Sequence, residues 1–171
     1  MTGLSSLLKH PLLVSHPLEF RDLIKSIFYN LALLYKEKGN HRSALRNCIE
    51  YNRIEKKNLS VILDISILCL KLLLLKESLF YFNSLIQLDT SLTMQSIYLE
   101  HVVLILFALE KWKECLQQIR ILKSRNYKEA EVLRLEEYIN SQLSQRDRKN
   151  DFFSEEYQDS GDGVNSILSG R

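Results

Sequence analysis

Hydrophobic and polar residues alternate with a helical period over residues 25–56, and small residues stand at fixed places within that pattern. Counting Lys25 as position 1, Ala32 and Ala44 fall at positions 8 and 20, with Gly39-Asn40 between them. Bulky side chains fill positions 4, 7, 11, 24 and 30: Phe28, Leu31, Tyr35, Cys48 and Ile54. The stretch therefore predicts two helices joined by a turn at Gly39-Asn40.

The same pattern recurs twice along the chain. A second copy begins at Leu59, 34 residues after the first, with Ser66 and Ser78 at the two small positions. A third copy begins at Ser96, 37 residues after the second, and carries Cys115 in its second helix. Recurrence at such a period is typical of helical-repeat proteins, in which each unit packs on the next.

The spacing has a steric explanation that predicts the fold. Small residues at positions 8 and 20 let the two helices of one repeat approach closely, while bulky residues fill the space between repeats. Scarce turn formers, 5 Gly and 2 Pro in 171 residues, disfavour an all-β fold. We therefore predict an all-α, right-handed α-solenoid of about three helical hairpins. The alternative is an ordinary helical bundle whose helices have similar lengths.

This pattern resembles that of the tetratricopeptide (TPR) family, W-x2-L-G-x2-Y followed by A-x3-F and a closing A and P. Two residues depart from it: Tyr51 at position 27, where the family prefers a small residue, and Lys56 at position 32, where it prefers proline. The resemblance implies an interaction module that binds a protein or peptide partner in a concave groove. The groove that binds chaperone carboxylates in some TPR proteins is not expected here, because Asp64 would repel a carboxylate.

Position 6 of the first helix in each repeat faces that groove in TPR proteins. Asn30, Asp64 and His101 occupy it here, and we predict that they line the groove together with Leu33 and Tyr35. Alternatively, these are solvated residues that contact no partner. The residues predicted at the close contacts between helices are Ala32, Ala44, Ser66, Ser78 and Cys115.

The ends of the chain divide it into three predicted regions. Residues 1–16 form an N-terminal segment, and Pro17 is expected at the start of a first helix of about residues 17–37. The repeat domain spans residues 17–145 and ends with an amphipathic capping helix at about 127–145. Residues 146–171 are predicted to be a disordered acidic tail.

Composition narrows the function and the compartment. The formal net charge is +2, although residues 151–171 alone hold five acids and one base. Three cysteines with no CxxC pair predict buried, reduced thiols in a cytosolic or nuclear protein. Residues 62–75 are apolar but are interrupted by Asp64 and Lys71, so no membrane segment is expected. Without a catalytic, metal-binding or cofactor motif, we expect a non-enzymatic protein with no cofactor.

A second function from another class is a nucleic-acid-binding helical repeat. Basic side chains gather over residues 111–128, at Lys111, Lys113, Arg120, Lys123, Arg125 and Lys128. Glu110 and Glu114 are interleaved with them, and no ladder of aromatic residues accompanies them. A solvated helix face is therefore favoured over a nucleic-acid surface.

One subfamily shows a closer resemblance. The segment LLKHPLL at 7–13, Asn30-Leu31-Ala32, IQLD at 86–89 and ECLQQI at 114–119 are similar to the N-terminal region of the calcineurin-binding Cabin protein and the third subunit of the HIR complex. The resemblance implies a nuclear scaffold subunit of a complex that deposits histones independently of replication, with histone-chaperone subunits as partners. The oligomeric state does not follow from any of these features.

Overall fold

A computed structural model describes the backbone of residues 17–159 and the side chains of residues 20–146 and 148. The predicted N-terminal segment, residues 1–16, lies outside the described residues, as do residues 160–171. Within 17–159 the chain forms helices and no strand, so the all-α prediction is confirmed. The helices are α3 (Pro17–Glu37), α4 (His41–Ile54), α5 (Leu59–Lys71), α6 (Leu75–Leu88), α7 (Leu92–Ala108), α8 (Trp112–Ser124) and α9 (Glu129–Asp159).

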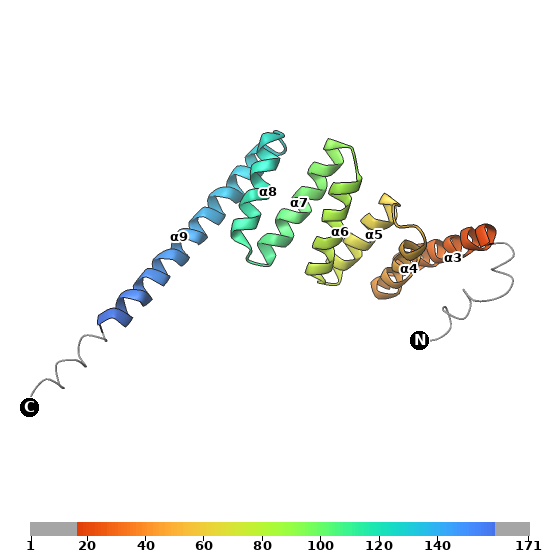
Figure 1. Ribbon diagram of the computed structural model, residues 1–171, viewed down its shortest axis with the longest axis horizontal. Helices are drawn as coiled ribbons and strands as arrows, with labels where there is room; N and C mark the ends of the chain where they lie inside the picture. The colour runs from red at the N-terminus through yellow and green to blue at the C-terminus, as the bar shows by residue number, and fades with distance from the viewer. Residues whose placement is uncertain (1–16, 160–171) are drawn as a thin grey trace, which may run out of the picture. The chain divides into compact units, whose positions relative to one another are not determined.

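The helices divide into two compact units between Leu109 and Glu110. The first unit holds α3 to α7, in which α3 contacts α4, α4 contacts α5, α5 contacts α6 and α6 contacts α7 (Figure 1). The second unit holds α8 and α9, which contact each other. The repeat domain predicted at residues 17–145 spans both units. Packing between consecutive helices is the arrangement of an α-solenoid, as predicted.

Polar side chains fix where several helices begin. Asn40 Oδ1 accepts a hydrogen bond from the backbone N–H of Ser43 at the start of α4, and Asn58 Oδ1 accepts one from Val61 at the start of α5, both at 3.1 Å. Each bond satisfies one of the N–H groups that the first turn of a helix leaves without a partner. The two asparagines therefore set the starting residues of these helices.

The turn after the first helix of each repeat has a repeated backbone conformation. Gly39, Leu73 and Glu110 have positive φ angles of 69°, 58° and 55°, and they stand at the same repeat position after α3, α5 and α7. Asn40 N–H donates to the Tyr35 carbonyl, and Leu74 N–H donates to the Cys69 carbonyl, both at 2.9 Å. These bonds close the C-terminal turns of α3 and α5, a role that favours glycine at the left-handed residue.

Leu73 supplies a stability prediction, because it holds this left-handed conformation with its side chain 80% exposed. Leu73→Gly is expected to raise the free energy of unfolding by about 1 kcal/mol, since glycine adopts a positive φ without steric cost. Urea denaturation of the full chain measures the change. Lys71→Gly, in the last turn of α5, is the control and is expected to lower the free energy by about 0.5–1 kcal/mol. A loss of stability in both variants would contradict the account of the turn.

Small side chains lie where the helices of a hairpin cross. Ala32 and Ala44 are 2% and 0% exposed and belong to one hydrophobic cluster of the first unit. Ser66 and Ser78 are both fully buried, and Ser78 Oγ donates to the Ser66 carbonyl at 2.9 Å, which joins α5 to α6 directly. Cys115 is fully buried on α8 of the second unit. A larger side chain at one of these places would push its neighbours out of their rotamers.

The three cysteines are buried thiols, as the sequence predicts. Burial raises the pKa of Cys48, Cys69 and Cys115 to about 11 from the usual 9.0. Nearby acids add to the shift, Asp64 at Cys48 and Glu77 at Cys69, while Lys36 opposes it at Cys48. Burial disfavours the thiolate, so these side chains are structural and poorly reactive.

The raised thiol pKa values predict that alkali destabilises the fold. A thiol of the unfolded chain ionises near pH 9, whereas the buried thiol of the folded chain stays protonated up to about pH 11. The contribution of the buried thiols to the free energy of unfolding is therefore complete below pH 9 and is lost as the pH rises toward 11. Urea denaturation at a series of pH values is expected to show stability falling over this window. A Cys48→Ala, Cys69→Ala, Cys115→Ala triple variant, the control, is expected to fall less steeply. An equal slope in both proteins would contradict the thiol origin.

The last helix is longer than predicted. The capping helix was expected at about 127–145, whereas α9 runs from Glu129 to Asp159 and so enters the segment predicted to be disordered. Arginine and lysine in residues 146–149 favour helix, and the first glycine of the tail comes only at 161.

Within the described part of the chain, no helix is long and apolar enough to cross a membrane.

Candidate functional site: a polar cleft between the first two hairpins

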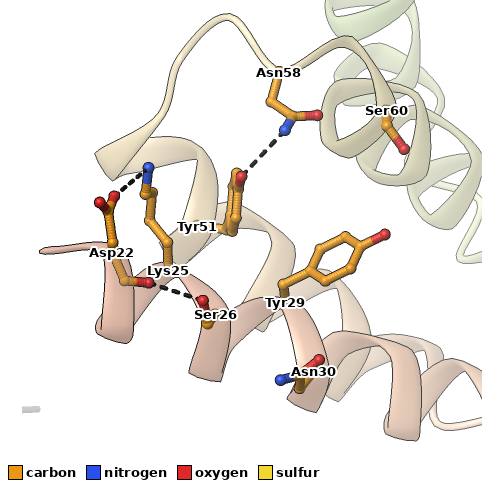
Figure 2. Close-up of a pocket in the computed structure, with 8 residues that line it drawn as sticks. All are labelled: Asp22, Lys25, Ser26, Tyr29, Asn30, Tyr51, Asn58 and Ser60. Carbon is orange, nitrogen blue, oxygen red and sulfur yellow. Dashed lines mark hydrogen bonds and ion pairs between the residues drawn. The ribbon is translucent and has the colours of Figure 1, made fainter. Parts of the chain in front are cut away.

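A polar cleft of about 430 Å³ lies beside α3 in the first unit (Figure 2). One wall comes from α3, and the other comes from the end of α4 and the residues that lead into α5. The lining residues are Asp22, Lys25, Ser26, Tyr29, Asn30, Tyr51, Asn58 and Ser60. Hydroxyl, amide and charged groups therefore surround it, with two tyrosine rings as the apolar surface.

The α3 wall presents three side chains with polar groups to solvent. Ser26, Tyr29 and Asn30 occupy positions 2, 5 and 6 of the first repeat, and all three are exposed. Ser26 Oγ donates to the backbone carbonyl of Asp22 at 2.9 Å, which fixes its rotamer along the helix. No hydrogen bond of the Asn30 side chain is seen among the described residues, so its donor and acceptor are available to a ligand.

The opposite wall is held in place by a hydrogen bond between side chains. Asn58 Nδ2 donates to the hydroxyl oxygen of Tyr51 at 3.1 Å, while Asn58 Oδ1 caps α5. The rings of Tyr29 and Tyr51 have their centroids 6.0 Å apart at a tilt of 54°. Because Asn58 is anchored on α5, it orients Tyr51 from α4 and stiffens the wall before any ligand arrives.

Charge at the cleft is concentrated on one lysine between two acids. Lys25 Nζ lies 2.8 Å from Asp22 Oδ1 and 3.4 Å from Glu55 Oε2. The hydrogen bond with Asp22 raises the pKa of Lys25 above its usual 10.5, with Glu55 adding to the effect and partial desolvation opposing it. Of the two acids only Asp22 lines the cleft, and Arg21 donates a hydrogen bond to the Ile54 carbonyl beside Glu55, so the formal charges at this edge balance.

The three residues predicted to line one groove have different surroundings. Asn30 lines the cleft. Asp64 forms an ion pair with Lys36, Nζ to Oδ1 at 2.6 Å, across from α3 to α5. His101 stacks on Phe82 with ring centroids 4.7 Å apart, and its Nδ1 lies 2.9 Å from the Ile97 carbonyl, so that nitrogen carries the proton. The cleft therefore includes Asn30 and neither of the other two.

The two remaining predicted residues lie closer to the core. Leu33 is half-buried on α3. Tyr35 packs against the hydrophobic cluster that contains Ala32, Ala44 and Cys48. Their place in a binding groove stays a prediction, as do the places of Asp64 and His101.

The sequence held signals for several cleft residues that the prediction omitted. Ser26, Tyr29 and Ser60 line the cleft at positions 2 and 5 of their repeats, whereas the prediction used position 6 alone. The sequence analysis noted Tyr51 only because the TPR family prefers a small residue at position 27, yet the Tyr51 ring lines the cleft. Asn58 was recognisable as a helix cap but not as the partner of Tyr51, since that contact depends on the turn between α4 and α5.

Part of the basic surface at residues 111–128 is engaged within the second unit. Lys111 Nζ lies 2.9 Å and 3.0 Å from the two carboxylate oxygens of Glu114, and Lys123 Nζ lies 2.6 Å from Glu136 Oε2. Lys128 Nζ lies 5.4 Å from the centroid of the Tyr127 ring. The ion pairs with Glu114 and Glu136 reduce the positive charge that this face presents to a polyanion.

Comparisons with known proteins identify the fold. No family model matches the sequence, and no curated protein matches it either. Among solved structures, the MamA RS-1 ArsTM double mutant is similar with a TM-score of 0.58 at 17% identity, over 71% of this chain and 68% of that one. The TPR2B domain of yeast Sti1, in a complex with an Hsp70 peptide, has a TM-score of 0.52 at 13% identity, over 70% of this chain and 98% of that one.

Both similar structures contain TPR repeats, so this chain has a TPR-like helical-repeat fold. The sequence prediction of that fold is confirmed. At these identities the likeness concerns the fold alone.

Proposed function

We propose that the chain is a non-enzymatic interaction module that binds an extended peptide segment of a partner protein in the cleft between α3 and α5. The observation that carries the proposal is the pair of tyrosines facing the cleft, Tyr29 and Tyr51, with the free amide of Asn30 beside them. Tyrosine rings offer contact area at low entropic cost, and an amide can pair with both the donor and the acceptor of a peptide backbone.

The charges of the cleft do not select a charged peptide. Asp22 and Lys25, the two charged lining residues, pair with each other at 2.8 Å. The hydroxyl and amide groups of the lining favour hydrogen bonds with a peptide backbone and with polar side chains. The preferred ligand is therefore an extended segment with polar side chains.

A displayed library of random peptides, selected on the full chain, tests this proposal. Enriched peptides are expected to bind Tyr29→Ala and Asn30→Ala at least about tenfold more weakly in fluorescence anisotropy, as for residues central to an interface. Tyr138→Ala, an exposed tyrosine on α9, is the control and is expected to bind as the unaltered chain does. Equal binding by all four proteins would contradict the cleft as the site.

Two other functions, nucleic-acid binding and catalysis, are tested by separate assays. Binding of nucleic acid in gel-shift assays that weakens steeply with added salt would favour the basic face at 111–128 instead. Any catalytic turnover lost in His101→Ala would contradict a non-enzymatic role.

A narrower proposal rests on the sequence resemblance to the Cabin protein and the third HIR subunit. On this proposal the chain is a nuclear subunit of a complex that deposits histones independently of replication. Its support is the set of short matches at residues 7–13, 30–32, 86–89 and 114–119. Affinity capture from cells tests it: recovery of histones or histone chaperones is expected, and recovery of heat-shock proteins alone would contradict it.

A further inference from the structure

An apolar stripe runs along the surface of α3 and is uncovered among the described residues. It consists of Leu23, Ile27, Leu31 and Leu34, and we call it the α3 stripe. These side chains are 56%, 48%, 37% and 51% exposed. They recur at spacings of four, four and three residues, so they share one face of the helix. Four exposed, contiguous aliphatic side chains form a patch of the kind that marks interaction sites.

The repeat itself shows what this face does elsewhere in the first unit. Ile27, Leu31 and Leu34 occupy repeat positions 3, 7 and 10. Their counterparts on α5 and α7 are 0–2% exposed: Val61, Ile65 and Leu68 on α5, and Tyr98, Val102 and Ile105 on α7. The same positions are thus buried in the second and third copies and open in the first.

The covering element is in each case the second helix of the preceding repeat. Leu45 and Cys48 of α4 belong to one cluster with Val61, Ile65 and Leu68 of α5, and α6 contacts α7 in the same way along the series. On α3, the described residues supply no such helix, because α4 packs on the other face through Ala32 and Ala44.

We propose that the α3 stripe is the docking surface for an amphipathic helix of a partner protein. That helix continues the series of interfaces between repeats, packing on α3 as α4 packs on α5. Its matching face carries small and aliphatic side chains at spacings i and i+3, as Leu45 and Cys48 do on α4. This surface is separate from the polar cleft and takes a helix instead of an extended peptide.

A second copy of the chain fits the stripe less well. In a second copy of the chain, the helices equivalent to α4 and α6 already contact α5 and α7, and α8 contacts α9, which buries Val132 and Ile139.

Methyl NMR of the full chain tests the proposal with a hydrocarbon-stapled peptide that has the α4 sequence, residues 40–54. The expected result is a set of shift changes at the methyl groups of the α3 stripe, with affinity at least about tenfold lower for Ile27→Asp and for Leu34→Ser. Leu104→Asp is the matched control, because Leu104 is 53% exposed on α7, and it is expected to leave binding unchanged. Circular dichroism of each variant confirms that the helices remain.

Several outcomes would overturn this inference. One is the absence of shift changes at the α3 stripe, or equal binding by Ile27→Asp and Leu104→Asp. Another is a free chain whose stripe methyls already show NOEs to residues 4–14, which would make the occupant a segment of the same chain. A third is a dimer in sedimentation analysis that Ile27→Asp dissociates, which would make the occupant a second copy.

Discussion

Phe82→Ala is expected to lower the free energy of unfolding by about 3–5 kcal/mol, the largest loss for a single side chain in this fold. Phe82 is fully buried on α6, where its ring stacks on His101 at 4.7 Å and lies 6.5 Å from the ring of Tyr98. Its removal leaves a cavity between two repeats, which the neighbouring rings cannot fill without moving α7. Guanidinium denaturation of the full chain, followed by circular dichroism, measures the loss.

Phe80→Ala on the same helix is the matched control. Phe80 is 65% exposed, so its truncation is expected to change the free energy by about 0.5 kcal/mol or less. The comparison separates the burial of an aromatic ring from the general effect of placing alanine in α6. Similar losses in the two variants would mean that Phe82 does not lie between packed repeats.

Ala44→Leu is expected to lower the free energy of unfolding by about 1–3 kcal/mol, even though it adds hydrophobic surface. Ala44 is fully buried in the cluster that also holds Ala32. A leucine there forces α3 and α4 apart or distorts side-chain rotamers, because protein interiors are close-packed. Thermal unfolding of the full chain is the measurement, and a lower Tm is expected.

Ala130→Leu is the control for this change. Ala130 is exposed in the first turn of α9, where leucine and alanine have similar helix propensity. Its Tm is expected to stay close to that of the unaltered chain. A stabilised Ala44→Leu variant would show spare volume at the helix crossing and would contradict close approach of α3 and α4.

The fold was predictable because its determinants are local and periodic. Small residues at positions 8 and 20 identify the helix crossings, and these residues are buried at Ala32, Ala44, Ser66 and Ser78. The bounds of the first helix followed from Pro17 and the turn at Gly39-Asn40. Such signals need only a few neighbouring residues, so a single sequence contains them.

The cleft was only partly predictable, since it depends on contacts between distant residues. Asn30 was found from its repeat position. Asp64 has the same position, but Lys36 lies 28 residues earlier and pairs with it, and no local pattern indicates that pairing. The contact of Asn58 with Tyr51 likewise depends on how the chain turns between α4 and α5. Side-chain partners of this kind require the packed structure.

The end of α9 was mispredicted for a different reason. Clustered charges and the later glycines suggested disorder after about residue 145, but charged residues such as arginine and lysine also favour helix. Composition alone could not separate a solvated helix from a coil in this segment.

Both the cleft and the α3 stripe depend on serial packing of the helices in the first unit. Methyl NOE spectroscopy of the full chain tests this packing most directly. Serial packing predicts NOEs between Ala32 and Ala44 within the first hairpin, and between Leu45 and Ile65 from one hairpin to the next. It predicts none between α3 and α7. NOEs joining α3 to α7 around a common centre would show a bundle instead and would contradict the account.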